Sequence, residues 1–294
     1  MRKPNFPDRA IRVTTYAELA GIVAGFAKGH LTFLMLLGPP GVGKSKIVQS
    51  TVGNSAVFLA GNASPFGIFS AAYQHRGQPL ILDDIDGIYR DRQGVRLLKA
   101  LGQSDQEKKL CWHSDARALA SRGLPNEFTT TSPVAIIGNE WCSANPDVVA
   151  LQDRAHCVVF EPSAIEVHWY ASHFFWDQEI FDFVGEHLHL AQPHSLRTYC
   201  LAWESKSAGL DWRRLVLSRF VSGNLLVVAR LKAHLTYRSE EQRAQAFVAG
   251  EHGCRSSYFS LAKKLKNSEP APTISVCGAL PAVTPEAQPI LDIT

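Results

Sequence analysis

One glycine-rich segment constrains the fold more than any other part of the chain: Gly38-Pro39-Pro40-Gly41-Val42-Gly43-Lys44-Ser45. It follows an apolar run, Leu31 to Leu37, and precedes a predicted helix that carries Ile47 and Val48. A strand, a glycine-rich turn and a helix in this order surround a phosphate group with backbone N–H groups and a helix N-terminus. The lysine then reaches the β- and γ-phosphates, and the serine hydroxyl binds Mg²⁺. The segment therefore predicts that ATP and Mg²⁺ are bound at residues 38–45.

Paired acids follow another apolar run. Pro79-Leu80-Ile81-Leu82 predicts a buried strand, and Asp83 and Asp84 come directly after it. We expect Asp83 to hold Mg²⁺ together with Ser45, and Asp84 to polarise the water that attacks the γ-phosphate. Asp86 is a weaker candidate for the second role. The simpler interpretation of residues 84 and 86 is a solvated acidic turn.

Strands and helices alternate over residues 1–162. Apolar runs predict five strands, at 31–37, 56–59, 79–82, 133–137 and 157–160. Helices are predicted from a capping box at Thr15 to Gly29, and at 66–74 and 95–101. This alternation indicates a parallel sheet covered on both faces. The predicted class is α/β, a three-layer αβα nucleotide-binding domain over residues 1–162.

Only helices are predicted beyond Pro162. The spans are 163–174, 177–190, 195–208, 211–232, 239–249 and 254–266. They divide into a helical lid at 163–233 and a small basic module of helix-turn-helix type at 234–266. The last segment, 267–294, has five prolines and no Lys or Arg, which predicts a mostly disordered tail.

Three polar residues stand where a hydrolytic site would need them. Asn139 ends the fourth predicted strand, where its side chain is expected to orient water. Arg154 lies just before the fifth strand, and an arginine there can stabilise transition-state charge on a neighbouring subunit's nucleotide. Arg197 begins a predicted lid helix and is expected to contact the γ-phosphate from above. We predict catalytic roles for these three residues and Asp84.

Residues 11–208 resemble an AAA+ ATPase, on the motifs at 38–45 and 80–84 and on Asn139, Arg154 and Arg197. The pattern is most similar to superfamily 3 helicases and related phage or plasmid replication ATPases. This resemblance implies a strand order of 5-1-4-3-2 and a ring-shaped homo-oligomer, typically a hexamer. The sequence departs from it in having Asp84 where most hydrolysing relatives have glutamate, and in the absence of a primase-like or origin-binding domain at the N-terminus.

Basic residues suggest the substrate. The net charge is +3, but residues 224–266 hold eight Lys and Arg against three Glu, which favours a polyanionic partner. In superfamily 3 relatives the interval after motif B carries a pore hairpin, and Lys108, Lys109 and His113 would contact DNA from it. The alternative is a solvated connection with Trp112 in the core.

The basic module offers a second DNA surface. Its last helix carries four residues that are expected to meet phosphates or base edges: Arg255, Tyr258, Lys263 and Lys264. The opposite face of this helix is predicted to carry Phe259, Ala262 and Leu265. The alternative is a packing element with a solvated basic face.

The sequence thus predicts an ATPase that couples ATP hydrolysis to DNA binding or remodelling in a phage, plasmid or mobile element, with a replication or recombination protein as a possible partner. The alternatives are a protein-remodelling or loader ATPase, and a slowly hydrolysing assembly switch. Scattered cysteines, the lack of a signal-like start and the shortness of the longest apolar run favour a cytoplasmic protein that does not enter a membrane.

Overall fold

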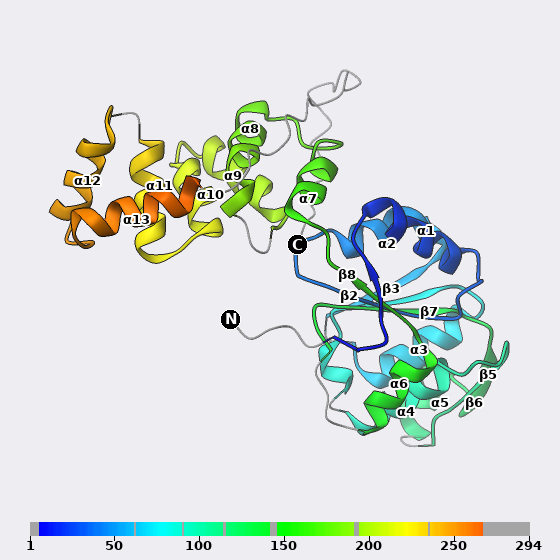
Figure 1. The fold of residues 1–294 in the computed structure, drawn as a ribbon. Coiled ribbons are helices and arrows are strands. Elements are labelled where there is room, and N and C mark those ends of the chain that lie inside the picture. The colour runs from blue at the N-terminus through cyan, green and yellow to red at the C-terminus, as the bar shows by residue number, and fades with distance from the viewer. Residues whose placement is uncertain are drawn as a thin grey trace. The chain divides into compact units, whose positions relative to one another are not determined.

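The computed structural model describes residues 6–61, 63–89, 91–113, 116–141, 146–190, 194–234 and 236–266. The predicted tail, 267–294, lies outside these residues. The chain divides into two compact units, residues 1–162 and 163–294 (Figure 1). Among the described residues, no helix has the length and apolar character needed to cross a membrane.

The first unit contains a six-stranded sheet. Its strands in spatial order are β1 (Ile11–Val13), β8 (His156–Phe160), β2 (Phe33–Leu37), β7 (Val134–Gly138), β4 (Leu80–Asp83) and β3 (Val57–Ala60). All neighbouring pairs are parallel. The five predicted strands therefore have the expected order, 5-1-4-3-2, and the α/β class is confirmed. The short edge strand β1 was missed because three residues give too little pattern to detect.

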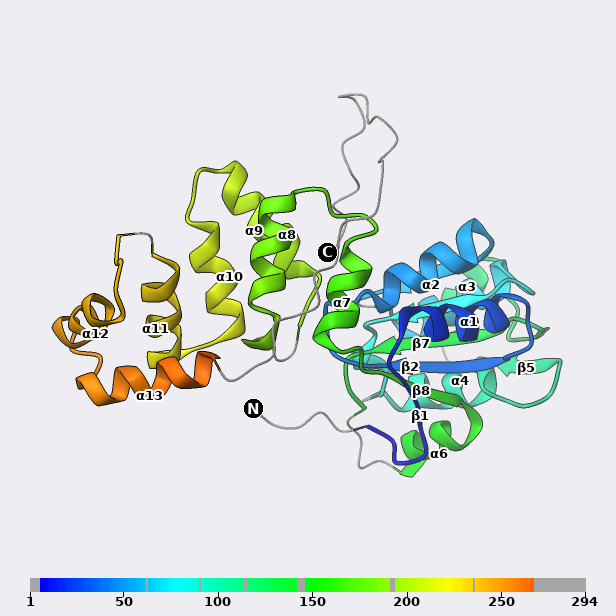
Figure 2. The ribbon, with the colours of Figure 1, turned by 45° about the horizontal axis from the view of Figure 1, so that its top comes forward.

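Helices cover both faces of this sheet. They are α1 (Tyr16–Ala27), α2 (Lys44–Val52), α3 (Pro65–Gln74), α4 (Arg92–Leu101), α5 (Ala116–Ser121) and α6 (Pro146–Arg154), with short 3-10 turns η1 (Gly53–Ser55) and η2 (Asp86–Tyr89). Figures 1 and 2 show α1 and α2 on one face, while α4 and α6 lie on the other. Side chains that alternate along β2 reach both layers, which is why its five residues are all buried.

A two-stranded antiparallel sheet interrupts the polar interval that follows α4. It pairs β5 (Lys108–Cys111) with β6 (Glu127–Thr130), and α5 lies between them in the chain. Burial alternates along β5, so Lys108 and Leu110 point inward whereas Lys109 and Cys111 point outward. The sheet is anchored to the core through Leu110 and Trp112, which join the same cluster as β2, β4 and β7.

The second unit is helical. Its elements are α7 (Ala164–Ala171), α8 (Gln178–Glu186), η3 (Leu188–Leu190), α9 (Arg197–Ser207), α10 (Trp212–Phe220), α11 (Gly223–Ala233), α12 (Glu240–Ala249) and α13 (Arg255–Lys266). The single helix predicted over 211–232 is wrong, because it is two helices. Val221 and Ser222 have extended backbones, and Gly223 follows at a positive φ of 60°. The apolar pattern continues across this break and conceals it.

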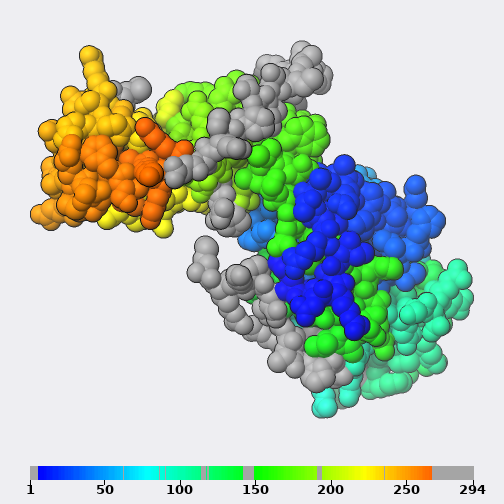
Figure 3. Space-filling model, in the orientation of Figure 1, coloured from blue at the N-terminus to red at the C-terminus, as the bar shows by residue number. Residues whose placement is uncertain are grey.

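The last two helices do not form a core of their own. Ala244, Phe247 and Tyr258 pack into one cluster with Leu217 of α10 and Val228 of α11. Figures 2 and 3 show α11, α12 and α13 as one packed body. The boundary predicted between residues 233 and 234 therefore runs through a shared core. The helices α10 to α13 therefore share one hydrophobic core.

Candidate nucleotide site

The glycine-rich loop between β2 and α2 has the backbone that a phosphate site requires. Gly38 packs so closely under β8 that a Cβ atom there would clash with the carbonyl oxygen of Phe160. Gly43 caps α2 with a left-handed backbone, φ 85°, which only glycine adopts at little cost. The loop is thus drawn tight against the sheet, and the N-terminus of α2 begins directly after it. The spacing of glycines in the sequence already specified this turn.

Lys44 lies inside the loop. Its side chain is buried, and its Nζ donates hydrogen bonds to the carbonyl oxygens of Gly38 and Pro39, both at 2.8 Å. A third bond, 3.2 Å long, goes to Oδ1 of Asn139 at the end of β7. The ammonium group is therefore fixed at the centre of the loop, in reach of groups that bind there.

Ser45 and Asp83 supply adjacent oxygen atoms. The Ser45 hydroxyl is hydrogen-bonded to the Asp83 carboxylate, which ends β4. Burial raises the pKa of Asp83, and the neighbouring Asp84 carboxylate raises it further, against the lowering effects of Ser45 and Lys44. A hydroxyl and a carboxylate in contact are ligands that Mg²⁺ prefers, and the cation would relieve the cost of a charged, half-buried Asp83. These residues fit the metal.

Asp84 is held in an unusual conformation. Its φ is 51°, in the left-handed region that non-glycine residues rarely adopt. Its N–H donates to the carbonyl oxygen of Ile137, 3.2 Å away, and its exposed carboxylate accepts a 3.2 Å hydrogen bond from Nδ2 of Asn139. Strain of this kind is common where a side chain must be aimed at a reacting group. Here it turns Asp84 toward the same edge of the sheet as Asn139.

Tyr16 is a residue of the site that sequence reasoning missed. Its hydroxyl donates a buried 2.9 Å hydrogen bond to the carbonyl oxygen of Val42, within the loop. Its ring packs edge-on against Phe160 with centroids 5.1 Å apart. Tyr16 thus connects α1 to the phosphate loop. The sequence marks it only as the first residue after the cap Thr15, so no local pattern distinguishes it from a core aromatic.

Two predicted arginines do not take part in the hydrogen bonds described for this cluster. Arg154 ends α6 with an exposed side chain, and its Nη1 donates to the carbonyl oxygen of Lys99 at the end of α4, 2.9 Å away. Arg197 begins α9 in the second unit and is also exposed. Their predicted roles toward ATP stay predictions.

The structure corrects the predicted DNA contact of Lys108. This side chain is fully buried, and its Nζ donates to the carbonyl oxygens of Ser132 and Thr32, at 2.9 and 3.3 Å. Burial lowers its pKa to about 8. Trp112 is also in the core, against Phe69, as the alternative interpretation had it. Consecutive lysines on a strand point to opposite faces, so only Lys109 can reach solvent.

Lys109 and His113 remain exposed in the same interval. Lys109 forms a 2.9 Å ion pair with Glu127 on β6, which raises the pKa of the lysine. Its charge is therefore partly neutralised by its own sheet. Of the three residues predicted to contact DNA from this interval, His113 alone is exposed without an ion pair to the described residues.

The last helix also departs from its prediction. Tyr258 is fully buried and donates a 2.8 Å hydrogen bond to Glu240, so it cannot contact a base. The buried stripe of α13 is Tyr258, Ala262 and Leu265, whereas Phe259 is 37% exposed. The predicted apolar face thus began one residue too late, at Phe259 instead of Tyr258. The tyrosine was assigned to the solvent-exposed face because its hydroxyl is polar.

Four basic residues of α13 face solvent, Lys266 among them, and the three that were predicted to contact DNA differ in pairing. Arg255 makes a bidentate pair with Glu241, with distances of 2.9 and 2.7 Å. Lys263 and Lys264 are exposed, and the described residues offer them no ion-pair partner. The positive face of α13 is therefore smaller than predicted and concentrated in its last turn.

The tight phosphate loop, the Ser45–Asp83 pair and the strand order together define an α/β unit with the P-loop fold. No family model matches the chain. An uncharacterized 36.7 kDa protein from the nrdC–mobD intergenic region of Enterobacteria phage T4 is 22% identical over 147 residues, which are 47% of this chain and 45% of the phage protein. The match thus spans less than half the length of this curated relative.

Solved structures with similar folds include two of NtrX from Brucella abortus. One is 16% identical with a TM-score of 0.39, and the other, a complex with ATP, is 14% identical with a TM-score of 0.36. Each comparison covers 86% of this chain and 69% of NtrX. C. elegans PCH-2 is 15% identical with a TM-score of 0.29, covering 85% of this chain and 68% of PCH-2. The strand order and the phosphate loop, rather than these distant superpositions, define the class.

Proposed function

We propose that this chain binds ATP with Mg²⁺ and hydrolyses it. The observation that supports this most strongly is a continuous chain of hydrogen bonds from Lys44 to Asn139 to Asp84. It joins the phosphate loop, the end of β7 and the end of β4, three segments far apart in the sequence. A site that only held a nucleotide would not require an amide to connect the lysine to a strained, exposed carboxylate.

Each residue then has a role in phosphoryl transfer to water. Lys44 and the loop N–H groups bind the β- and γ-phosphates, and Ser45 with Asp83 would hold Mg²⁺, which neutralises phosphate charge when bound. Asn139 orients a water molecule, and Asp84 accepts its proton as the oxygen attacks the γ-phosphorus and the bond to ADP breaks. Arg154 would stabilise the transition state from a neighbouring subunit. The proposal therefore includes a homo-oligomeric ring.

Asp84→Asn tests the hydrolytic part. The variant keeps an oxygen acceptor for Asn139 but cannot take up the proton, so we expect ATP turnover to fall by at least tenfold, within the range of about 10²–10⁴ that a general base contributes. ATP affinity, measured with a fluorescent analogue, should stay within about twofold. Asp91→Asn, which removes the acid that caps α4, serves as the control. Normal turnover by Asp84→Asn would remove Asp84 from this role.

We further propose that the cycle acts on DNA, as in replication-type motors of phages, plasmids or mobile elements. The support is the excess of Lys and Arg in residues 224–266 and the exposed Lys263 and Lys264, which form no ion pair with the described residues. Phosphate contacts by such side chains bind nucleic acid without sequence preference. Action on a polypeptide, as in a loader, or slow turnover in an assembly switch would give no response to DNA.

Stimulation of ATP turnover by DNA distinguishes action on DNA from the two alternative functions. We expect single- or double-stranded DNA to raise the rate several-fold at low salt, and the effect to decline steeply as salt increases. Lys263→Glu/Lys264→Glu should weaken DNA binding at least tenfold while basal turnover is kept. If neither form of DNA changes the rate of ATP turnover, and the double variant binds DNA as the wild type does, the proposed action on DNA is excluded.

A further inference from the structure

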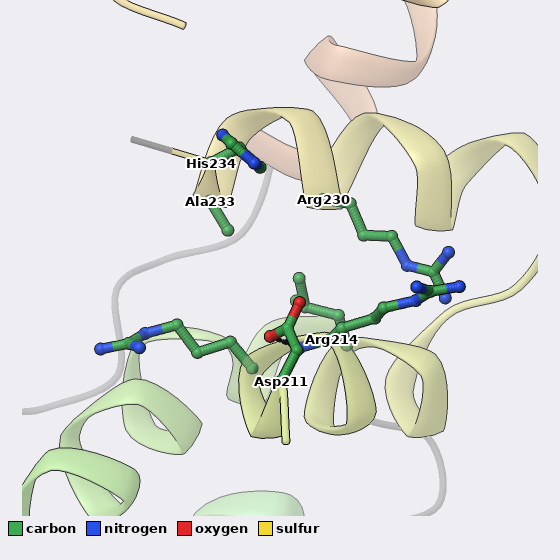
Figure 4. Close-up of a pocket in the computed structure, with 7 residues that line it drawn as sticks. Asp211, Arg214, Arg230, Ala233 and His234 are labelled. Atoms are coloured by element: carbon green, nitrogen blue, oxygen red, sulfur yellow. Dashed lines mark hydrogen bonds between the residues drawn. The ribbon is translucent and has the colours of Figure 1, made fainter. Parts of the chain in front are cut away.

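A cavity of about 670 Å³ lies in the second unit, between α10 and α11. Its lining contains four basic side chains and one acid: Arg213, Arg214, Arg230, His234 and Asp211, with Leu217 and Ala233. Figure 4 shows the guanidinium groups of Arg214 and Arg230 beside one another on one side of the cavity, and His234, which follows the C-terminal end of α11, on the other side. The volume is in the range of small-ligand sites. None of the predicted site residues belongs to it.

The one acid at the cavity does not balance the two neighbouring arginines. Neither makes an ion pair with a described residue, and Nε of Arg230 is buried without a hydrogen-bond partner. Asp211, the one acid of the lining, caps α10 and accepts a 3.0 Å bond from the backbone N–H of Arg214. Partial burial and the nearby Arg214 lower the pKa of Arg230, whereas Asp211 opposes them. One carboxylate therefore faces two guanidinium groups, and the site keeps a net positive charge.

Two other basic side chains of α10 and α11 are paired. Arg213 pairs with Glu179 and lies over the Trp212 ring. Lys232, on α11, forms a 2.9 Å ion pair with Glu240. The unit therefore neutralises the cations next to Arg214 and Arg230 with its own carboxylates. Two guanidinium groups facing each other without such a partner are stabilised when an anion lies between them.

The chemistry of the cavity suits a phosphate group. Guanidinium forks match phosphate oxygens in bidentate geometry, better than a point charge such as ammonium. Leu217 and Ala233 provide an apolar floor, and the His234 ring offers a flat surface for a base or sugar. Arg214, Asp211 and His234 are all exposed, so the mouth is open and a chain can enter and leave it. An open, partly apolar site favours a nucleotide unit within a strand.

We propose that Arg214 and Arg230 form a phosphate-binding site for a nucleic-acid strand, with one nucleotide unit held between α10 and α11. This inference rests on the proposed action on DNA and gives that action a specific contact outside α13.

Fluorescence anisotropy with a labelled single-stranded oligonucleotide tests this site on the full chain. We expect Arg214→Gln and Arg230→Gln each to weaken binding about tenfold, and the double variant to lower the slope of log affinity against log salt by about 0.7, the value for one phosphate contact on a single strand. Arg230→Lys keeps the charge but loses the fork, so its loss should be intermediate. Arg219→Gln removes the same charge from α10 outside the cavity and should change binding less than twofold.

Several results would overturn the proposal. If Arg219→Gln and Arg230→Gln lose the same oligonucleotide affinity, the effect is one of overall charge and not of this cavity. If pyrophosphate binds at Arg230 and the oligonucleotide does not, the cavity is a site for a small anion. No oligonucleotide binding by the wild-type chain would remove both this site and the action on DNA. Binding of a fluorescent ATP analogue and ATP turnover report on the phosphate loop separately, so ATP hydrolysis would stand in each case.

Discussion

Lys44→Ala is expected to lower ATP turnover about 10²–10³-fold, the range found when one preorganised donor to transition-state charge is removed. The physical reason is the position of the ammonium group, which is buried in the loop and held by Gly38, Pro39 and Asn139. Alanine leaves the negative charge of the β- and γ-phosphates without its nearest cation. It also breaks the connection to Asn139 and Asp84, so binding and chemistry should both suffer.

The measurement is steady-state phosphate release with parallel binding of a fluorescent ATP analogue. Lys28→Ala, at the end of α1, removes an equal charge from an exposed position and should leave both quantities within about twofold. Circular dichroism checks that each variant keeps its fold. Turnover in Lys44→Ala that matches Lys28→Ala would contradict hydrolysis at this loop, whatever the affinity for nucleotide.

The helical unit is expected to lose several kcal/mol of stability as the pH falls from about 6.5 to about 4. Its core contains a buried hydrogen-bonded triad in which the Tyr199 hydroxyl lies 2.7 Å from Nδ1 of His168 and 3.1 Å from Nε2 of His194. His168 also stacks on Phe181 with centroids 3.9 Å apart. Nδ1 of His194 is buried and has no hydrogen-bond partner among the described residues.

Protonation of these histidines is costly in the folded state. Burial lowers the pKa of His168 to about 4, with a small opposing effect of Asp182, and lowers the pKa of His194 to about 3, with a further contribution from His168. The unfolded chain binds these protons near pH 6.5, so between about pH 6.5 and 4 it binds more protons than the folded chain. The stability contribution is therefore complete above pH 6.5 and is lost on acidification.

Urea unfolding between pH 7.5 and 4.5 measures this loss, and hydrogen exchange of peptides from α7 to α9 assigns it to the helical unit. Replacing both residues, His168→Gln/His194→Gln, should flatten the pH dependence although it lowers stability at pH 7. His173→Gln removes an exposed histidine that follows α7 and should leave the slope unchanged. A pH dependence that persists in the double variant would assign the acid sensitivity to other groups.

Some features of the molecule could be predicted from the local pattern of apolar and polar residues. The loop at 38–45, the acid that ends β4 and the polar end of β7 each follow an apolar run, because buried parallel strands must end where polar side chains can meet solvent. That rule predicted the five main strands and the cluster of Lys44, Asp83 and Asn139 at one edge. It failed for β1, which is too short for a pattern, and at Val221 and Ser222, where an extended backbone interrupts an unbroken apolar spacing.

The opening motif thus determined by itself that the chain forms a P-loop unit, because glycines, a lysine and a serine at fixed spacing specify both a turn and its charge. Only the tertiary structure decided which cations are available to a partner. Lys108 and Tyr258 face inward, Lys109 and Arg255 are paired by their own unit, and Arg214 with Arg230 converge from separate helices. Burial and pairing depend on residues distant in sequence, so charge counted along the chain does not give the charge presented at the surface.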